Sequence, residues 1–176
     1  IVTAKARGAD LFAIGELSGL QAFDIADPAA PKKRGASTIS RGVQALDVQG
    51  PYAYVTERRV LNILDVSALP AVKIAMSFPL PGVPRAVVVR DRYAYLPSDQ
   101  YGFLVVDVGE PKAPKVAGSL EMPGFAYGLA LDGTRAYVCS SDTGFHVLDI
   151  SDPAKPALLG SFRTAGEARA VAVVGA

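Results

Sequence analysis

The sequence lacks several residues and patterns that would assign a function directly. Its 176 residues include one cysteine, Cys139, one histidine, His146, and no tryptophan. A single cysteine excludes an internal disulfide, and one histidine with one cysteine gives too few ligands for a metal site built from these residue types. The 18 Lys and Arg residues nearly balance the 17 Asp and Glu residues, which leaves a net charge of +1. We therefore expect no metal and no cofactor. We also expect no nucleic-acid partner, because the excess of basic residues that is typical of nucleic-acid-binding proteins is missing.

Long apolar runs and helical periodicity are missing as well. No run approaches the roughly 18 to 20 apolar residues that a membrane-spanning helix needs, so we expect no such segment. No stretch repeats its apolar residues with the 3.6-residue period of a helix over about ten residues. Instead, short runs rich in Tyr, Val, Phe and Ile alternate with turns rich in Gly, Pro, Asp and Ser. This composition predicts an all-β protein.

Short phrases recur along the chain at a nearly constant interval. Four aspartates that follow apolar residues are spaced by 41, 42 and 42 residues: Asp24, Asp65, Asp107 and Asp149. The phrases LFAI, YAYV, YAYL and RAYV form a second series, in which Ala13, Tyr54, Tyr95 and Tyr137 correspond. After three of the aspartates, prolines follow at offsets of four and seven residues, and a glycine follows at offset eleven. Three markers that share one period indicate a tandem repeat.

Each repeat contains four strand-like runs, which in the third repeat cover residues 85–89, 93–97, 102–108 and 114–120. Some runs are apolar at consecutive positions, such as 103–106, which indicates a strand that is covered on both faces. Four short antiparallel strands in each repeat of about 42 residues are typical of a β-propeller blade. The sequence therefore predicts a single β-propeller domain or segment over 1–176, with blades at about 1–41, 42–83, 84–125 and 126–167.

The four repeated aspartates end the third strand of each blade. A side-chain carboxylate at this position can accept hydrogen bonds from the backbone N–H groups of the turn that follows. The prolines preset the turn and stop further ladder pairing. We interpret Asp24, Asp65, Asp107 and Asp149 as structural turn caps rather than as a catalytic or metal-binding array.

The segment YAYLPSDQYGFLVVDVGEPKAPKVAGSLEMPG, residues 93–124, resembles the LVIVD repeat of bacterial and archaeal proteins. The likeness is close in the third and fourth repeats and good in the first, GLQAFDIADPAAP, and the second repeat, VLNILDVSALPAV, departs most from the pattern. The resemblance implies a β-propeller that serves as a scaffold or recognition surface. It also implies an extracellular, periplasmic or cell-surface location. It carries over no catalytic residues, because the motif positions are structural.

Residues 168–176 contain the phrase RAVAVVG, which predicts one extra inner strand beyond the four full blades. We expect the chain to be part of a larger propeller of about six to eight blades. Two alternatives stay open. One is a four-bladed ring closed by this last strand, and the other is an eight-bladed ring formed by two copies of the chain.

Ligands of propellers usually meet the loops before the first strand and between the second and third strands of each blade. The sequence places several charged and aromatic residues there, and Arg and Tyr are the types that binding interfaces favour. The candidate ligand-binding residues are Arg41, Arg58, Arg85, Asp99, Tyr101, Tyr127, Asp142 and Arg169. We predict no catalytic residue: His146 is interpreted as a surface or hydrogen-bonded histidine, and Cys139 as a small half-buried residue.

These observations favour a noncatalytic recognition module or scaffold for a protein or glycan partner. The first alternative is a propeller enzyme, a hydrolase or a lyase, with its active site at the mouth of the channel. Two carboxylates close together at that mouth, or a metal site, would favour this alternative. The second alternative is a structural subunit whose exposed blade edges pair with another chain or with a missing part of the same protein.

Overall fold

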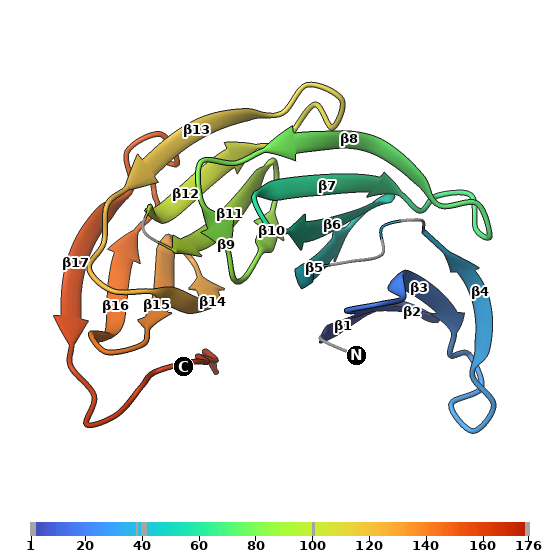
Figure 1. The fold of residues 1–176 in the computed structure, drawn as a ribbon, viewed down its shortest axis with the longest axis horizontal. Coiled ribbons are helices and arrows are strands. Elements are labelled where there is room, and N and C mark those ends of the chain that lie inside the picture. The colour runs from blue at the N-terminus through green and yellow to red at the C-terminus, as the bar shows by residue number, and fades with distance from the viewer. Residues whose placement is uncertain (1–2, 38, 40–41, 100, 175–176) are drawn as a thin grey trace. The chain divides into compact units, whose positions relative to one another are not determined.

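The structure is a computed structural model, which describes residues 3–37, 39, 42–99 and 101–174. Within these residues the chain forms 17 strands and no helix. The chain divides into two compact units, Ile1–Leu80 and Pro81–Ala176, and each unit contains two antiparallel sheets. The fold is all-β, as the sequence predicts, and Figure 1 shows how the strands of each sheet follow one another in chain order.

Unit 1 holds repeats 1 and 2, each a four-stranded sheet whose strand order is the chain order. Repeat 1 consists of β1 (Thr3–Arg7), β2 (Asp10–Gly15), β3 (Gly19–Asp24) and β4 (Lys32–Ala36). Repeat 2 consists of β5 (Val43–Gln49), β6 (Tyr52–Glu57), β7 (Val60–Asp65) and β8 (Lys73–Pro79). Tight two-residue turns join the first and second strands of both sheets, so neighbouring strands are antiparallel.

Unit 2 holds repeats 3 and 4. Repeat 3 consists of β10 (Val88–Arg90), β11 (Tyr93–Asp99), β12 (Gly102–Asp107) and β13 (Lys115–Leu120), and the short β9 (Val83–Pro84) also pairs with β11. Repeat 4 consists of β14 (Ala126–Asp132), β15 (Arg135–Ser140), β16 (Gly144–Asp149) and β17 (Ala157–Phe162). The register between the third and fourth strands shifts at one place in every repeat, which marks a shared β-bulge.

The repeated aspartates occupy equivalent turns in all four repeats. In each case the Oδ1 atom accepts the backbone N–H of the residue two positions later, at 2.8 to 3.0 Å. The acceptors and donors are Asp24 and Ala26, Asp65 and Ser67, Asp107 and Gly109, and Asp149 and Ser151. This bond holds the turn that leaves the third strand.

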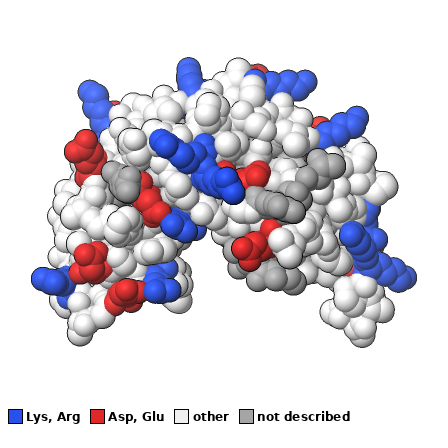
Figure 2. All heavy atoms as spheres, in the orientation of Figure 1, with Lys and Arg blue, Asp and Glu red and all other residues white. Residues whose placement is uncertain are grey.

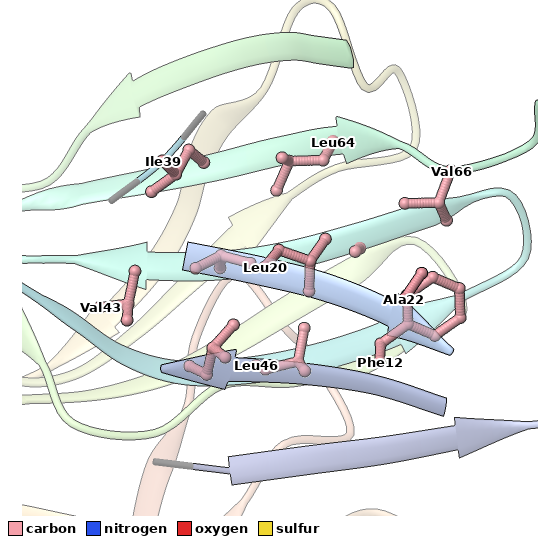
Figure 3. Packing of buried hydrophobic residues seen from close by; sticks show 11 residues of the cluster. Phe12, Leu20, Ala22, Ile39, Val43, Leu46, Leu64 and Val66 are labelled. Carbon is pink, nitrogen blue, oxygen red and sulfur yellow. The ribbon is translucent and has the colours of Figure 1, made fainter. Parts of the chain in front are cut away.

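Each unit buries an apolar core between its two sheets. In unit 1, Phe12 and Leu20 of repeat 1 lie in one cluster with Leu46 and Leu64 of repeat 2, and Figure 3 shows these side chains directed toward one another. In unit 2, Tyr95, Phe103 and Val105 of repeat 3 lie in one cluster with residues of repeat 4: Ala136, Val138, Leu148 and Ile150. Sheets that bury side chains on both faces explain why several strands are apolar at consecutive positions.

The strand register corrects one sequence correspondence. Phe12 lies 12 residues before the turn aspartate of its repeat, as do Tyr95 and Tyr137, and it is fully buried in the core of unit 1. Phe12, rather than Ala13, is therefore the equivalent of these tyrosines. The one-residue error arises because two residues lie between Glu57 and Val60, the last paired residues of β6 and β7, whereas three residues lie between the corresponding pairs of the other repeats.

Two expected inner strands also differ from the prediction. Residues 85–87 lie outside the strands, because Pro97 on the facing strand β11 has no N–H to donate. The Arg85 N–H donates to the Pro97 carbonyl at 3.1 Å. Residues 169–174 form no strand either. The backbone of Arg169 and Ala170 approaches Gly128 of β14. They approach the place that a Cβ atom of Gly128 would occupy, which is on a face of β14 rather than at its hydrogen-bonding edge, so this approach supplies no ladder.

Candidate functional site

The candidate site of unit 2 is built on irregularities of the inner strands. Tyr127 is the extra residue of a β-bulge in β14, between Ala126 and Gly128, and Gln44 occupies the same kind of bulge in β5. Arg85 lies in the interruption between β9 and β10. A bulge breaks the alternation of side chains and redirects one of them, so these positions can present side chains that a regular strand would turn elsewhere.

Arg85 forms an ion pair with Asp99 at the end of β11. Its Nε and Nη2 atoms donate hydrogen bonds to Oδ2 of Asp99 at 2.9 and 2.7 Å. The aspartate side chain is 14% exposed and the arginine side chain is 37% exposed. The hydrogen bond to Asp99 raises the pKa of Arg85 above its ordinary value, so the guanidinium stays charged.

Tyr127 lies within reach of two guanidinium groups. The Cζ atom of Arg85 is 5.7 Å from the centre of the tyrosine ring, and the Cζ atom of Arg169 is 5.9 Å from it. Arg169 in turn donates from Nε and Nη2 to Oε2 of Glu167, at 2.9 and 2.6 Å. We call Arg85, Asp99, Tyr127, Glu167 and Arg169 the inner-strand cluster. Its two cations and two anions sum to zero charge.

Three buried polar atoms lie on or beside the strands that carry this cluster. Among the described residues of unit 2, Oγ of Ser98 and Oδ1 of Asp99 on β11 and Oγ of Ser140 on β15 have no hydrogen-bond partner. Ser140 pairs with Ala126, the residue before Tyr127. Buried polar atoms are satisfied by protein, water or ligand in most folded proteins, so these three atoms could receive a polar group of a ligand.

A cavity of about 400 Å³ adjoins the cluster through Glu167. It is lined by Asp142, Arg163, Thr164, Ala165, Gly166 and Glu167. Its size lies within the usual range for small-ligand pockets, about 300 to 1,000 Å³. Figure 2 shows basic and acidic side chains interspersed over the face in view, in agreement with the nearly balanced composition.

The structure brings together four of the eight candidate residues: Arg85, Asp99, Tyr127 and Arg169. Asp142 lines the adjoining cavity and accepts a hydrogen bond from Ser141 at 3.0 Å. Tyr101 is 44% exposed and its ring lies beside Gly82. Arg58 belongs to unit 1, where its side chain lies against Gly42, and Arg41 falls outside the described residues.

Sequence reasoning missed Glu167 and Ser140. Glu167 could have been found, because an acid two residues before Arg169 is a ready partner for its guanidinium. Ser140 gave no signal, since a serine at a strand end is common and its burial depends on the neighbouring sheet.

His146 and Cys139 are both buried. The Nδ1 atom of His146 lies 2.6 Å from Ser161 Oγ and its Nε2 atom lies 3.1 Å from Thr143 Oγ1, so both ring nitrogens have hydroxyl partners. Burial lowers the pKa of His146 and raises the pKa of the Cys139 thiol. His146 is thus hydrogen-bonded, and Cys139 is more buried than its sequence position indicated. Within the described ranges, no group of three or more His, Cys, Asp or Glu residues could hold a metal ion.

Comparisons with known proteins agree with the repeat and the fold. The family model of the LVIVD repeat matches residues 40–78, 81–121 and 123–164, which correspond to repeats 2, 3 and 4, so the second repeat matches although the motif pattern predicts it to be the most divergent. The chain is a tandem-repeat protein with a β-propeller-like fold. It belongs to the LVIVD-repeat family. No curated protein matches the sequence.

Solved structures share the fold at low sequence identity. The computationally designed Ika8 protein is 12% identical with a TM-score of 0.79, and the match covers 98% of this chain and 52% of that one. A functionally unknown protein from Desulfotomaculum acetoxidans DSM 771 is 11% identical with a TM-score of 0.80, over 98% of this chain and 59% of that one. Citrobacter koseri AztD is 15% identical with a TM-score of 0.59, over 94% of this chain and 46% of that one. This chain thus spans about half the length of these structures. In the part of the chain that is described, no helix is long and apolar enough to cross a membrane.

Proposed function

We propose that this chain is a noncatalytic recognition module that binds a partner protein through the inner-strand cluster. The observation that carries the proposal is Tyr127 beside two guanidinium groups, each paired with a carboxylate. Arginine and tyrosine are enriched among the residues that dominate binding energy at protein interfaces. Held by their acids, the two arginines have lost part of their conformational freedom before a partner arrives.

The cluster favours a polypeptide over the glycan alternative. Two guanidinium groups lie within 6 Å of the Tyr127 ring centre, so less of the ring is open for stacking against a sugar. The remaining guanidinium N–H groups can donate to backbone carbonyls or carboxylates of a protein segment. The zero net charge argues against a highly charged polyanion as the ligand.

The contacts of the ionisable groups support binding rather than the hydrolase or lyase alternative. A general acid or base needs a proton that it can exchange at the reacting atoms. In the cluster, Asp99 and Glu167 are each engaged by an arginine. His146 is buried with hydroxyl partners at both ring nitrogens. An exported or cell-surface location fits this role, and its support is the family to which the chain belongs.

The test is selection of a phage-displayed library of random twelve-residue peptides on the purified chain, followed by affinity measurement of the selected peptides. We expect Arg169→Ala and Tyr127→Ala to weaken binding at least tenfold, which corresponds to about 1.4 kcal/mol. Tyr127→Phe keeps the ring beside both guanidiniums and should bind within about threefold of the parent. Arg135→Ala is the matched control, because this exposed arginine begins β15 at the end opposite Ser140.

Two results would overturn the proposal. Selected peptides that bind Arg169→Ala and Tyr127→Ala as tightly as the parent would place recognition elsewhere. Binding to a glycan array, lost in these variants while no peptide is selected, would identify a sugar as the partner. Circular dichroism melting of each variant within about 2 °C of the parent shows that a loss of affinity is not a loss of fold.

A further inference from the structure

Each unit shows how one repeat packs against the next. We call the side of a repeat that contacts its successor the forward face. In unit 1 the forward face of repeat 1 includes Phe12, Leu20 and Ala22, all fully buried. In unit 2 the equivalent residues of repeat 3 are Tyr95, Phe103 and Val105, which are at most 3% exposed. The same three positions are therefore core positions whenever the next repeat covers them.

The forward face of repeat 4 has the same chemistry but is not buried. Its equivalent residues are Tyr137, Phe145 and Val147, and each is only partly buried. Phe162 of β17 stacks on Phe145, with ring centres 5.6 Å apart, and is 61% exposed. This face therefore exposes part of the aromatic and aliphatic side chains that repeats 1 and 3 bury in a core.

A glycine of the fourth strand lies where a turn of the next repeat packs closely against this strand. A Cβ atom added at Gly35 would lie 2.7 Å from the carbonyl oxygen of Pro70, in the turn that follows the third strand of repeat 2. A Cβ atom added at Gly118 would overlap the carbonyl oxygen of Pro153, in the same turn of repeat 4. Gly160 occupies the equivalent position in repeat 4, and among the described residues nothing lies within 4 Å of its added Cβ atom.

The opposite side of repeat 1 carries the residue positions that, in repeat 4, pack against the forward face of the preceding repeat. We call the side that contacts the preceding repeat the rear face. In repeat 4 it includes Ala136, Val138, Leu148 and Ile150, all at most 3% exposed. The equivalent residues of repeat 1 are Leu11, Ala13, Phe23 and Ile25, of which only Ala13 is buried. Its turn ADPAAP, residues 26–31, also resembles the turn SDPAKP, residues 151–156, that lies against Gly118.

We propose that the forward face of repeat 4 binds the rear face of repeat 1 of a second copy of this chain. The turn at Pro28 and Ala29 of that copy lies against Gly160, as the turn at Pro153 and Ala154 lies against Gly118. The contact repeats two interfaces that the chain already forms within its own units. It is heterologous, since two different faces meet, and a pair of copies then has one further forward face and one further rear face for the same contact. The inference is independent of the proposed partner-binding cluster.

The experiment is size-exclusion chromatography with light scattering on the full chain, from about 1 to 100 μM. We expect the parent to form a species of twice 18.3 kDa. Phe162→Asp and Phe23→Asp each place a charge at one face and should weaken association at least tenfold. Leu17→Asp is the matched control, because Leu17 is an 81% exposed leucine of a loop and lies on neither face.

Mixing the two variants gives the sharpest result. In a mixed pair, one junction carries both substitutions and the other carries none, so the mixture should associate better than either variant alone. Gly160→Val tests the same junction without a charge, because its side chain enters open space in the isolated chain but blocks the turn of a second copy. It should weaken association at least tenfold and leave the melting temperature of the dilute chain unchanged.

The outcomes that overturn the proposal are distinct. A parent that stays at 18.3 kDa at every concentration shows that no second copy binds, whether these faces stay free or meet within one chain. Association that is weakened by Phe162→Asp but not by Phe23→Asp shows that two forward faces meet instead. Association that is unaffected by Gly160→Val places the contact elsewhere.

Discussion

Two repeats carry a buried polar residue in the middle of the third strand, bonded to a serine of the fourth strand. In repeat 2 the Ser77 hydroxyl donates to Asn62 Oδ1 at 2.6 Å, and in repeat 4 Ser161 Oγ lies 2.6 Å from His146 Nδ1. The strand register places both pairs at equivalent positions. His146 is 1% exposed, and burial lowers its pKa because the charged imidazolium would lose its hydration.

The buried His146 predicts a loss of stability in mild acid. Because its pKa is lower in the folded state than in the unfolded state, the unfolded chain binds a proton first as the pH falls below about 6.5. The free energy of unfolding should then fall by up to about 1.4 kcal/mol per pH unit, until the folded form is protonated as well. His146→Asn should remove this slope and keep a partner for Ser161, as Asn62 does for Ser77.

The measurement is urea unfolding of the parent and of His146→Asn at about pH 7.5, 6 and 5. The pKa values of Asp107 and Asp149 are lowered, the first chiefly by Arg92 and the second by the Ser151 N–H, so these carboxylates titrate below this window. Equal slopes in the two proteins would show that His146 is not the group responsible. A steeper slope in the variant would contradict the direction of the pKa shift.

At the residue scale, the sequence predicts contacts that are local and repeated. The turn role of the aspartates could be predicted because donor and acceptor lie two residues apart in all four repeats. The pairing of Arg85 with Asp99 could not, because it spans 14 residues and depends on the broken ladder opposite Pro97. The sequence pattern assigns Ala13 instead of Phe12 to the position of the repeated tyrosines, since only the strand register reveals the shorter connection in repeat 2.

The outermost strands β13 and β17 differ in how closely a neighbouring turn approaches them. Gly118 in β13 is approached by the turn between β16 and β17, whereas Gly160 in β17 is not approached by any described residue. The glycines have the same place in their repeats, each eleven residues after the turn aspartate. Their surroundings, rather than their backbone conformation, therefore distinguish them.

This difference predicts opposite effects of one substitution. Gly118→Ala should lower the free energy of unfolding by about 1 to 3 kcal/mol, because the new methyl group overlaps the Pro153 carbonyl oxygen and the turn must move. Gly160→Ala should leave it unchanged or raise it by up to about 1 kcal/mol, because alanine restricts the unfolded chain. Urea unfolding at a concentration where the chain is monomeric measures both. Equal losses at the two glycines would mean that the turn does not constrain β13.

At the element scale, the sequence predicts the number and order of strands well and their irregularities poorly. Every repeat has the four strands that its apolar runs and turns predict. The interruption at residues 85–87 and the bulge at Tyr127 depend on which backbone groups face each other across the sheet. The strand predicted after residue 168 has the right composition, but a strand also needs a hydrogen-bonding partner, and composition cannot supply one.

The chain divides into two units, and each unit contains an apolar core between its own two sheets. The cluster around Phe12 and Leu20 belongs to repeats 1 and 2, and the cluster around Tyr95 and Phe103 belongs to repeats 3 and 4. In repeat proteins, stability is approximately a sum over repeats and over the contacts between neighbouring repeats. A substitution in one core should therefore act mainly on the unit that contains it.

Hydrogen exchange can test this division across the whole chain. Phe12→Ala removes a fully buried ring and should cost unit 1 about 3 to 5 kcal/mol. Amides of β1–β8 should then exchange at least tenfold faster, while amides of β14–β17 keep the rate of the parent. Phe103→Ala should give the reverse pattern, with faster exchange in β10–β17 and little change in β1–β4. If either variant accelerates both units equally, they open as one cooperative structure, and the two units are not separate units of stability.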